Sequence, residues 1–133
     1  MLHYKVFERG EDRQWIVMIH GAGGSIEVWY RQITDFARHF NLLLIDLAGH
    51  GGSAEGKEAR HTLFDFGSQA EQVMEVVRHL QLPKAHFMGL SLGSIVVRFI
   101  ADRYPEQVTS MVLAGAVTEL CWESRMLLRL ANL

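Results

Sequence analysis

The sequence predicts an α/β fold in which a mostly parallel β-sheet carries helices on both faces. Short apolar runs such as "WIVMI" and "LLLI" alternate along the chain with longer amphipathic stretches. The runs are apolar without interruption, which is typical of strands buried on both faces of a parallel sheet. Glycine-rich turns, "GAGG", "AGHGG" and "GLSLG", follow or close three of these runs. Because parallel strands are joined by right-handed crossovers, the three turns are expected to meet at one edge of the sheet.

The first half of the chain contains three expected strands and one expected helix. Residues 2–8 indicate a short half-buried strand, and residues 14–20 and 41–47 indicate buried strands. Between the last two, apolar residues recur at helical spacing over about 26–39, and Ser25 is a suitable N-cap. A helix is therefore expected to connect these two strands.

The second half continues the same alternation after a polar loop over 52–61. Thr62 is expected to begin a helix, with Asp65 as its capping-box partner. The elements expected after it are strands over 85–90 and 108–117 and helices over 92–103 and 119–133. The helix over 92–103 is apolar on nearly every face, which predicts deep burial.

Composition places the chain among ordinary globular proteins. Its 133 residues fit one domain, and 49% are apolar and 21% charged. The net charge is −2 and the basic residues are scattered, which argues against nucleic-acid and membrane partners. Cys121 is the single cysteine, and the N-terminal residues are too charged for a signal peptide, so a cytoplasmic location is expected.

The G-x-S-x-G pattern at residues 89–93 is the first candidate for chemistry. Gly89 and Gly93 permit a tight strand-to-helix turn that points the Ser91 hydroxyl out of the sheet. The first amide of the next helix, that of Leu92, and the helix dipole favour negative charge beside it. The structural alternative is a serine that merely caps the helix.

The earlier turn "HGAGGS" at residues 20–25 allows two interpretations. It can aim a backbone amide, that of Ala22, at the same developing oxyanion. Alternatively, Gly21 and Gly23 begin a dinucleotide-binding fingerprint with Asp46 as the ribose ligand. The third glycine of that fingerprint is replaced by Ile26, and no Gly-Lys-Ser/Thr follows any glycine-rich turn.

Taken together, the motifs resemble those of the α/β-hydrolase fold superfamily. The matching segments, in order, are residues 20–25, 46–53 and 89–94, supported by "RYPEQV" at 103–108 and "MVLAGAV" at 111–117. The resemblance implies that Ser91 is the nucleophile and that the amides of Ala22 and Leu92 form the oxyanion hole. It assigns the shaping of the site loops to His20, Gly21, Gly23, Asp46, His50, Gly89 and Gly93. It implies neither a metal nor an organic cofactor.

The resemblance covers the N-terminal half of such a protein. Residues 1–118 correspond to the first part of the core domain, and residues 119–133 to the start of a lid or following helix. In this fold the acid and the histidine follow the serine along the chain. All seven histidines here precede Ser91, so the acid and base are expected beyond residue 133. The alternative is that His20 or His50, which belong to the same edge, serves as the base.

The expected function is that of the N-terminal portion of a serine hydrolase, inactive by itself. Its substrate class is an ester, a lactone, a thioester or a carbon–carbon bond next to a ketone; a lyase or cofactor-free peroxidation is a further variant. The alternative is a non-catalytic module that binds a small ligand or a protein. Because the strand over 108–117 would be an open edge, a homodimer or association with a missing C-terminal fragment is expected. Trp29, Leu90 and Leu92 suggest an apolar lining.

Overall fold

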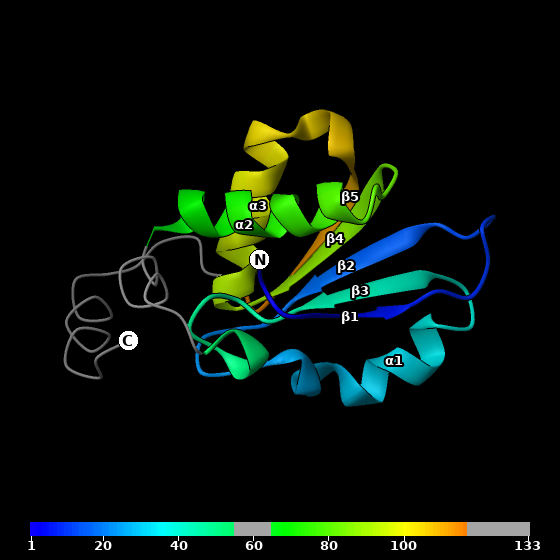
Figure 1. The fold of residues 1–133 in the computed structure, drawn as a ribbon, viewed down its shortest axis with the longest axis horizontal. Helices are drawn as coiled ribbons and strands as arrows, with labels where there is room; N and C mark the ends of the chain where they lie inside the picture. The colour runs from blue at the N-terminus through cyan, green and yellow to red at the C-terminus, as the bar shows by residue number, and fades with distance from the viewer. Residues whose placement is uncertain (55–64, 117–133) are drawn as a thin grey trace.

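A computed structural model describes residues 1–54 and 65–116. Its five strands form one sheet of order β1-β3-β2-β4-β5 (Figure 1). Strand β1 runs antiparallel to β3, and all other neighbours are parallel. The strands are β1 Tyr4–Phe7, β2 Trp15–Ile19, β3 Asn41–Ile45, β4 Ala85–Leu90 and β5 Val108–Ala114. The expected mostly parallel sheet is therefore confirmed.

Helices cover both faces of this sheet. Helix α1, Tyr30–Phe36, lies on one face, and α2, Phe66–His79, and α3, Leu92–Arg103, lie on the other (Figure 1). Short 3-10 turns occupy Ile26–Trp29, Gly51–Ser53 and Pro105–Gln107. Among the described residues, no helix combines the length and apolar character that a membrane span requires.

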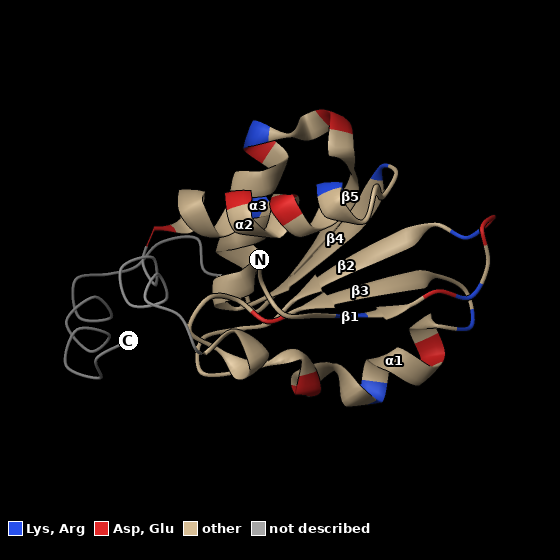
Figure 2. Cartoon of the chain, viewed as in Figure 1, with Lys and Arg blue, Asp and Glu red and all other residues tan. Residues whose placement is uncertain are grey.

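Two apolar cores lie on the two sides of the central strands. Alternate residues of β2, Val17 and Ile19, pack in the core with α2 and α3, whereas Ile16 and Met18 pack in the core beside α1. Every residue of β2 and β3 is buried. This two-sided burial explains why the strand sequences are continuously apolar. Charged side chains of both signs are interspersed over the helices and the loops at the periphery (Figure 2).

The boundaries of two expected helices need correction. The helix expected over 26–39 is a 3-10 turn followed by the short α1. Helix α2 begins at Phe66, and Asp65 is its N-cap, because its carboxylate accepts a hydrogen bond from the Gly67 amide at 3.1 Å. Thr62 and the expected helix over 119–133 lie outside the described residues.

Helix α3 is less buried than its composition suggests. Val96, Val97 and Ile100 are buried, but Arg98 and Phe99 are exposed. Strand β5 is similar, since Met111 and Val112 are each 47% exposed. Consecutive strand residues point to opposite faces, so β5 shows apolar side chains on both sides of the sheet. Within the described part of the chain β5 pairs only with β4, and its outer edge is open.

Helix α3 starts in direct contact with the ends of β2 and β4, which is possible only because two residues lack a side chain. A Cβ at Gly89 would lie 2.3 Å from the Gly93 carbonyl oxygen. A Cβ at Gly93 would lie 2.4 Å from the Ile19 oxygen and 2.6 Å from the His20 oxygen. These contacts are with backbone atoms, so no side-chain movement can relieve them.

Gly89→Ala is therefore expected to destabilise the chain strongly, by more than about 3 kcal/mol, beyond usual overpacking. Gly23→Ala is the matched control, because a Cβ at Gly23 has nothing within 4 Å and only its φ of 70° opposes the change. The control should cost roughly 1–2 kcal/mol. Urea unfolding of both variants measures the difference, and equal losses would contradict the packing described.

Candidate active site

Ser91 occupies a strained turn between β4 and α3. Its φ of 50° and ψ of −113° lie in a backbone region that residues other than glycine rarely adopt. This conformation costs about 1–3 kcal/mol. The Ser91 amide donates to the Ala114 oxygen at 2.8 Å, and the Ser94 hydroxyl donates to the Ser91 oxygen at 2.5 Å. The backbone of Ser91 is thus held from β5 and from α3.

The Ser91 side chain is exposed and makes no capping hydrogen bond to α3, although it occupies the N-cap position. A serine whose role was to cap the helix would accept a hydrogen bond from an amide of the first turn. The observed geometry therefore does not support the capping interpretation. It leaves the hydroxyl open on the outside of the turn.

The turn after β2 lies directly beside Ser91. A Cβ placed at Gly21 would be 3.3 Å from the Ser91 Cβ and 3.1 Å from the Leu90 oxygen. No residue in the described ranges accepts a hydrogen bond from the amide of Ala22, which is exposed. Leu92 is the first residue of α3, and the first amides of a helix have no acceptor within it. The turn after β2 and the start of α3 therefore both lie next to Ser91.

Asp46 joins the second glycine-rich turn to the first. Its buried carboxylate accepts hydrogen bonds from the Ile26 amide at 2.7 Å, the Gly52 amide at 2.8 Å and the His3 Nδ1 at 2.8 Å. Burial alone would raise the pKa of Asp46, but the Gly52 and Ile26 amides, with His3, outweigh it and lower that pKa below 3.8. The carboxylate is consequently ionised and fully engaged by the protein.

This engagement excludes the dinucleotide interpretation for the described site. A ribose-binding carboxylate must be open to the ligand, whereas both Asp46 oxygens accept hydrogen bonds within the fold and the residue is 1% exposed. Asp46 shapes the loops instead.

His20 joins the same loops and is wholly buried. Its Nδ1 donates to the Gly21 oxygen at 2.7 Å, and its Nε2 accepts from the Leu47 amide at 3.0 Å. Burial, only partly opposed by the hydrogen bond to Gly21, lowers the pKa of His20. With both ring nitrogens in use and the ring neutral, His20 has no nitrogen left to take a proton from Ser91.

His50 packs against His20 with ring centroids 5.1 Å apart, and its Nδ1 donates to the Ala48 oxygen at 3.0 Å. No histidine of the described ranges is hydrogen-bonded to Ser91. The structure therefore does not support His20 as the base. His50 makes no hydrogen bond to Ser91 that would support it in that role either.

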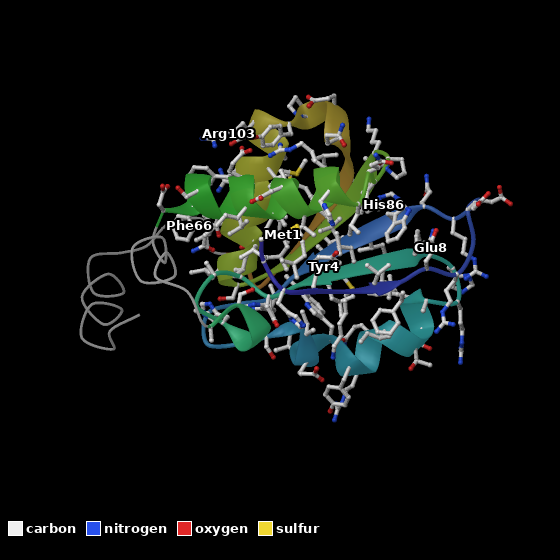
Figure 3. All side chains as sticks on the ribbon, viewed as in Figure 1. Met1, Tyr4, Glu8, Phe66, His86 and Arg103 are labelled. Carbon is white, nitrogen blue, oxygen red and sulfur yellow. The ribbon has the colours of Figure 1, made fainter. Side chains whose placement is uncertain are left out.

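A hydrogen bond between a serine hydroxyl and an imidazole does occur in the described structure, at the opposite end of the sheet. The Ser110 hydroxyl and His86 Nδ1 are 2.8 Å apart, and His86 Nε2 donates to the Gln14 side-chain oxygen at 3.1 Å. Figure 3 shows His86 where the parallel strands begin. Ser110 lies within β5 rather than before a helix, so no free helix amides face its hydroxyl.

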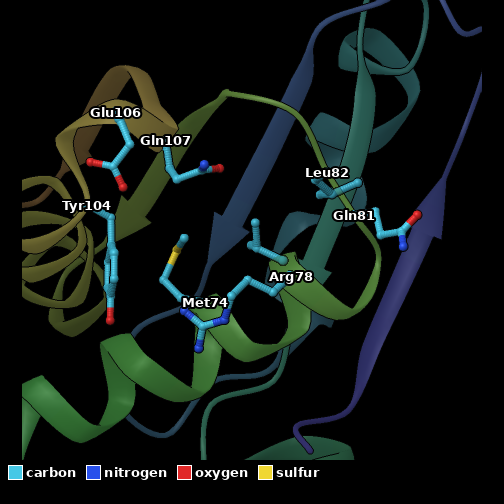
Figure 4. A pocket seen from close by; sticks show the side chains of 8 residues that line it. Met74, Arg78, Gln81, Leu82, Tyr104, Glu106 and Gln107 are labelled. Carbon is cyan, nitrogen blue, oxygen red and sulfur yellow. The ribbon is translucent and has the colours of Figure 1, made fainter.

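A surface cavity of about 330 Å³ also lies away from Ser91 (Figure 4). It is lined by residues from the end of α2, among them Met74 and Arg78, and by Tyr104 and Glu106 next to the Pro105–Gln107 turn. None of its lining residues is one to which the motifs assign a role in the site. Trp29, expected to line the site, is instead buried in the core beside α1.

Sequence patterns did not identify two residues that hold the site. His3 lies 43 positions before Asp46 in the chain, and no motif connects them. Ser94 follows the G-x-S-x-G pattern, and its hydroxyl holds the Ser91 carbonyl. A serine three residues after the turn serine, at helix spacing, is the one signal that could have indicated the second contact.

The buried pair predicts a loss of stability in acid. His20 with its lowered pKa stabilises the fold fully above its ordinary value of 6.5, and this contribution falls as pH drops below it. Asp46 adds a second loss as pH falls below 3.8. Urea unfolding across this range should show both losses, and Asp46→Asn should remove the second. Asp35→Asn, at a 75% exposed side chain, is the control that should leave it in place. A free energy of unfolding that is flat from pH 7 to 4.5 contradicts the role of His20.

Comparisons with known proteins agree with this fold. The model of the family described as "alpha/beta hydrolase fold" matches residues 14–130. The (E)-2-((N-methylformamido)methylene)succinate hydrolase of Acinetobacter baylyi is 33% identical over 115 residues, which cover 86% of this chain and 41% of that protein. The 3-oxoadipate enol-lactonase 2 of the same organism is 25% identical, covering 93% of this chain and 46% of the relative.

A solved structure shows the same arrangement. The crystal structure of a hydrolase from Pseudomonas aeruginosa PA01 superposes with a TM-score of 0.81 and 27% identity, covering 96% of this chain and 46% of the other. The chain thus spans less than half the length of the relatives it matches. With the family model matching most of its length, the chain belongs to the α/β-hydrolase fold family.

Proposed function

We propose that the chain is the N-terminal portion of a serine hydrolase, in which Ser91 is the nucleophile and the amides of Ala22 and Leu92 bind the oxyanion. The observation that carries this proposal is the strained, exposed Ser91 at the start of α3, beside the turn that contains Ala22. Strain of this kind persists where the surrounding structure enforces it, and it commonly accompanies function.

The proposed reaction begins when the Ser91 oxygen attacks the carbonyl carbon of the substrate. A histidine beyond residue 133 takes the hydroxyl proton, and the electron pair of the carbonyl bond moves to its oxygen. The amides of Ala22 and Leu92 donate hydrogen bonds to this oxyanion. The tetrahedral intermediate expels an alcohol, thiol or carbon leaving group, which receives the proton from the histidine. Water then releases the acyl group from Ser91 by the same steps.

The substrate is proposed to be an ester, a lactone, a thioester or a carbon–carbon bond next to a ketone. Two of the relatives are named as a hydrolase of an amide-bearing succinate derivative and as an enol-lactonase, which supports carbonyl chemistry of this type. The Ser91 hydroxyl needs no metal for this attack when a base and an oxyanion site are present.

Labelling by a fluorophosphonate tests the nucleophile. In the polypeptide that carries the complete catalytic set, we expect stoichiometric labelling at Ser91, and Ser91→Ala should abolish both labelling and hydrolysis. Ser110→Ala is the matched control, because the Ser110 hydroxyl already contacts the imidazole of a histidine. Its labelling should equal that of the unmodified protein. Peptide mass spectrometry locates the label, and a label on Ser110 instead would overturn the proposal.

A non-catalytic binding module is the second candidate function. It is favoured by the absence, in the described residues, of any histidine in contact with Ser91, and by the open edge of β5 with exposed Met111 and Val112.

An open parallel edge pairs readily with another strand. We propose that the strand completing it comes from the remainder of the polypeptide, since the relatives are more than twice as long as the matched region.

The 133-residue chain by itself should therefore self-associate through β5. Sedimentation velocity is expected to show dimers or larger species, and Val112→Lys should shift the chain toward monomer by placing a charge on the edge. Val28→Lys, at a similarly exposed apolar side chain away from β5, is the control that should leave association unchanged. A stable monomer at all concentrations would contradict an incomplete sheet.

A further inference from the structure

We propose that His3 is a positioning residue for the reaction, and that it acts through Asp46 on the turn that carries the Ala22 amide. This inference rests on the proposed function, because it concerns the same oxyanion site. It joins the first residues of the chain to Ser91 through hydrogen bonds and contacts that the motifs do not indicate.

The first step is a closed set of hydrogen bonds around His3. Its Nδ1 donates to Asp46 Oδ2 at 2.8 Å, and its amide donates to the Ser53 hydroxyl oxygen at 2.8 Å. The Ser53 hydroxyl donates to the Asp46 carbonyl oxygen at 2.8 Å, and the Asp46 amide donates to the His3 carbonyl oxygen at 2.9 Å. His3 and Asp46 are thus joined through side chain, main chain and a bridging serine.

The second step is the space that two glycines leave for this pair. A Cβ at Gly52 would lie 2.4 Å from His3 Cγ, so the imidazole rests against the bare backbone of Gly52. A Cβ at Gly51 would lie 2.4 Å from Asp46 Oδ2, and Gly51 has a φ of 48°. The turn after β3 is therefore shaped around the imidazole and the carboxylate together.

The third step leads from Asp46 to the serine. The oxygen not used by His3, Oδ1, accepts the Ile26 amide at 2.7 Å, at the start of the 3-10 turn Ile26–Trp29. Five residues earlier in the chain, Gly21 approaches Ser91, and the Gly24 amide donates to the Gly21 oxygen at 3.1 Å. The rotation of one carboxylate therefore fixes where the segment containing Ala22 leaves and re-enters the fold.

The His3 contact bears on orientation more than on folding. The His3 side chain is 43% exposed, and Asp46 keeps two amide donors when the imidazole is removed. A carboxylate with fewer donors samples more rotations, and an oxyanion donor displaced by a fraction of an ångström stabilises the transition state less. Loss of His3 should consequently reduce kcat while leaving KM nearly unchanged.

The test compares His3→Leu with His3→Asn in the polypeptide that carries the complete catalytic set. Leucine removes the donor but keeps bulk over Gly52, whereas the asparagine amide can place a nitrogen where Nδ1 lies. We expect His3→Leu to lower kcat about five- to tenfold, less than the roughly hundredfold loss of an oxyanion donor. KM should change less than twofold, and His3→Asn should restore most of kcat.

Hydrogen exchange supplies a readout that does not depend on activity. The Ile26 amide should exchange faster in His3→Leu than in the unmodified protein, and close to normally in His3→Asn. His39→Leu is the matched control, since His39 is exposed after α1 and has no contact with Asp46. It should change neither exchange at Ile26 nor kcat.

The outcomes separate this inference from the proposed function. If the unmodified protein is not labelled at Ser91, the proposed function fails, whatever His3 does. If Ser91 is labelled but His3→Leu leaves kcat and Ile26 exchange unchanged, the positioning role fails alone. A kcat lowered equally by the leucine and asparagine variants, with normal exchange at Ile26, also overturns it.

Discussion

The close approach of α3 to the ends of β2 and β4 is the constraint from which the rest of the site follows. Backbone meets backbone at Gly89 and Gly93, where even a methyl group would overlap a carbonyl. The chain between these glycines therefore makes a sharp reversal, in which Ser91 has a positive φ. Its amide is drawn to Ala114 at the end of β5, so four segments of the fold determine the conformation of one residue. The strain at Ser91 is sustained by packing throughout the sheet.

A second layer of polar contacts organises the neighbouring turns. Asp46 and His20 are buried, and their side chains are fully used within the fold. Asp46 accepts from the amides of Ile26 and Gly52 and from the His3 imidazole, and His20 bonds to Gly21 and Leu47. Buried polar groups that are fully hydrogen-bonded specify one arrangement of the chain around them. The described residues thus contain a strained, exposed serine between organised turns, and none of their histidines is hydrogen-bonded to Ser91.

The central strands and the convergence of the glycine-rich turns could be predicted from sequence, because both depend on local patterns. Two-sided burial demands uninterrupted apolar residues in β2 and β3, and parallel topology then places their ends together. The boundaries of the helix over 26–39 could not be predicted, because the Ile26 amide is held by the distant Asp46 and the chain forms a 3-10 turn there. Asp65 is the N-cap of α2 and not the capping-box partner that the sequence predicts. The residue that caps depends on where the helix begins, and α2 begins at Phe66.

The contact between His3 and Asp46 could not be predicted from a local pattern, because the two residues lie at the ends of different strands. The apolar composition of α3 predicts deeper burial than the structure shows. Phe99 on α3 is exposed, as is Met111 on β5. The account as a whole is tested most directly by a crystal structure of the complete polypeptide after reaction with a phosphonate. It predicts a Ser91 Oγ–phosphorus bond with the phosphonyl oxygen about 2.7–3.1 Å from the amides of Ala22 and Leu92. A phosphonyl oxygen turned away from both amides, or phosphorus on another residue, would contradict it.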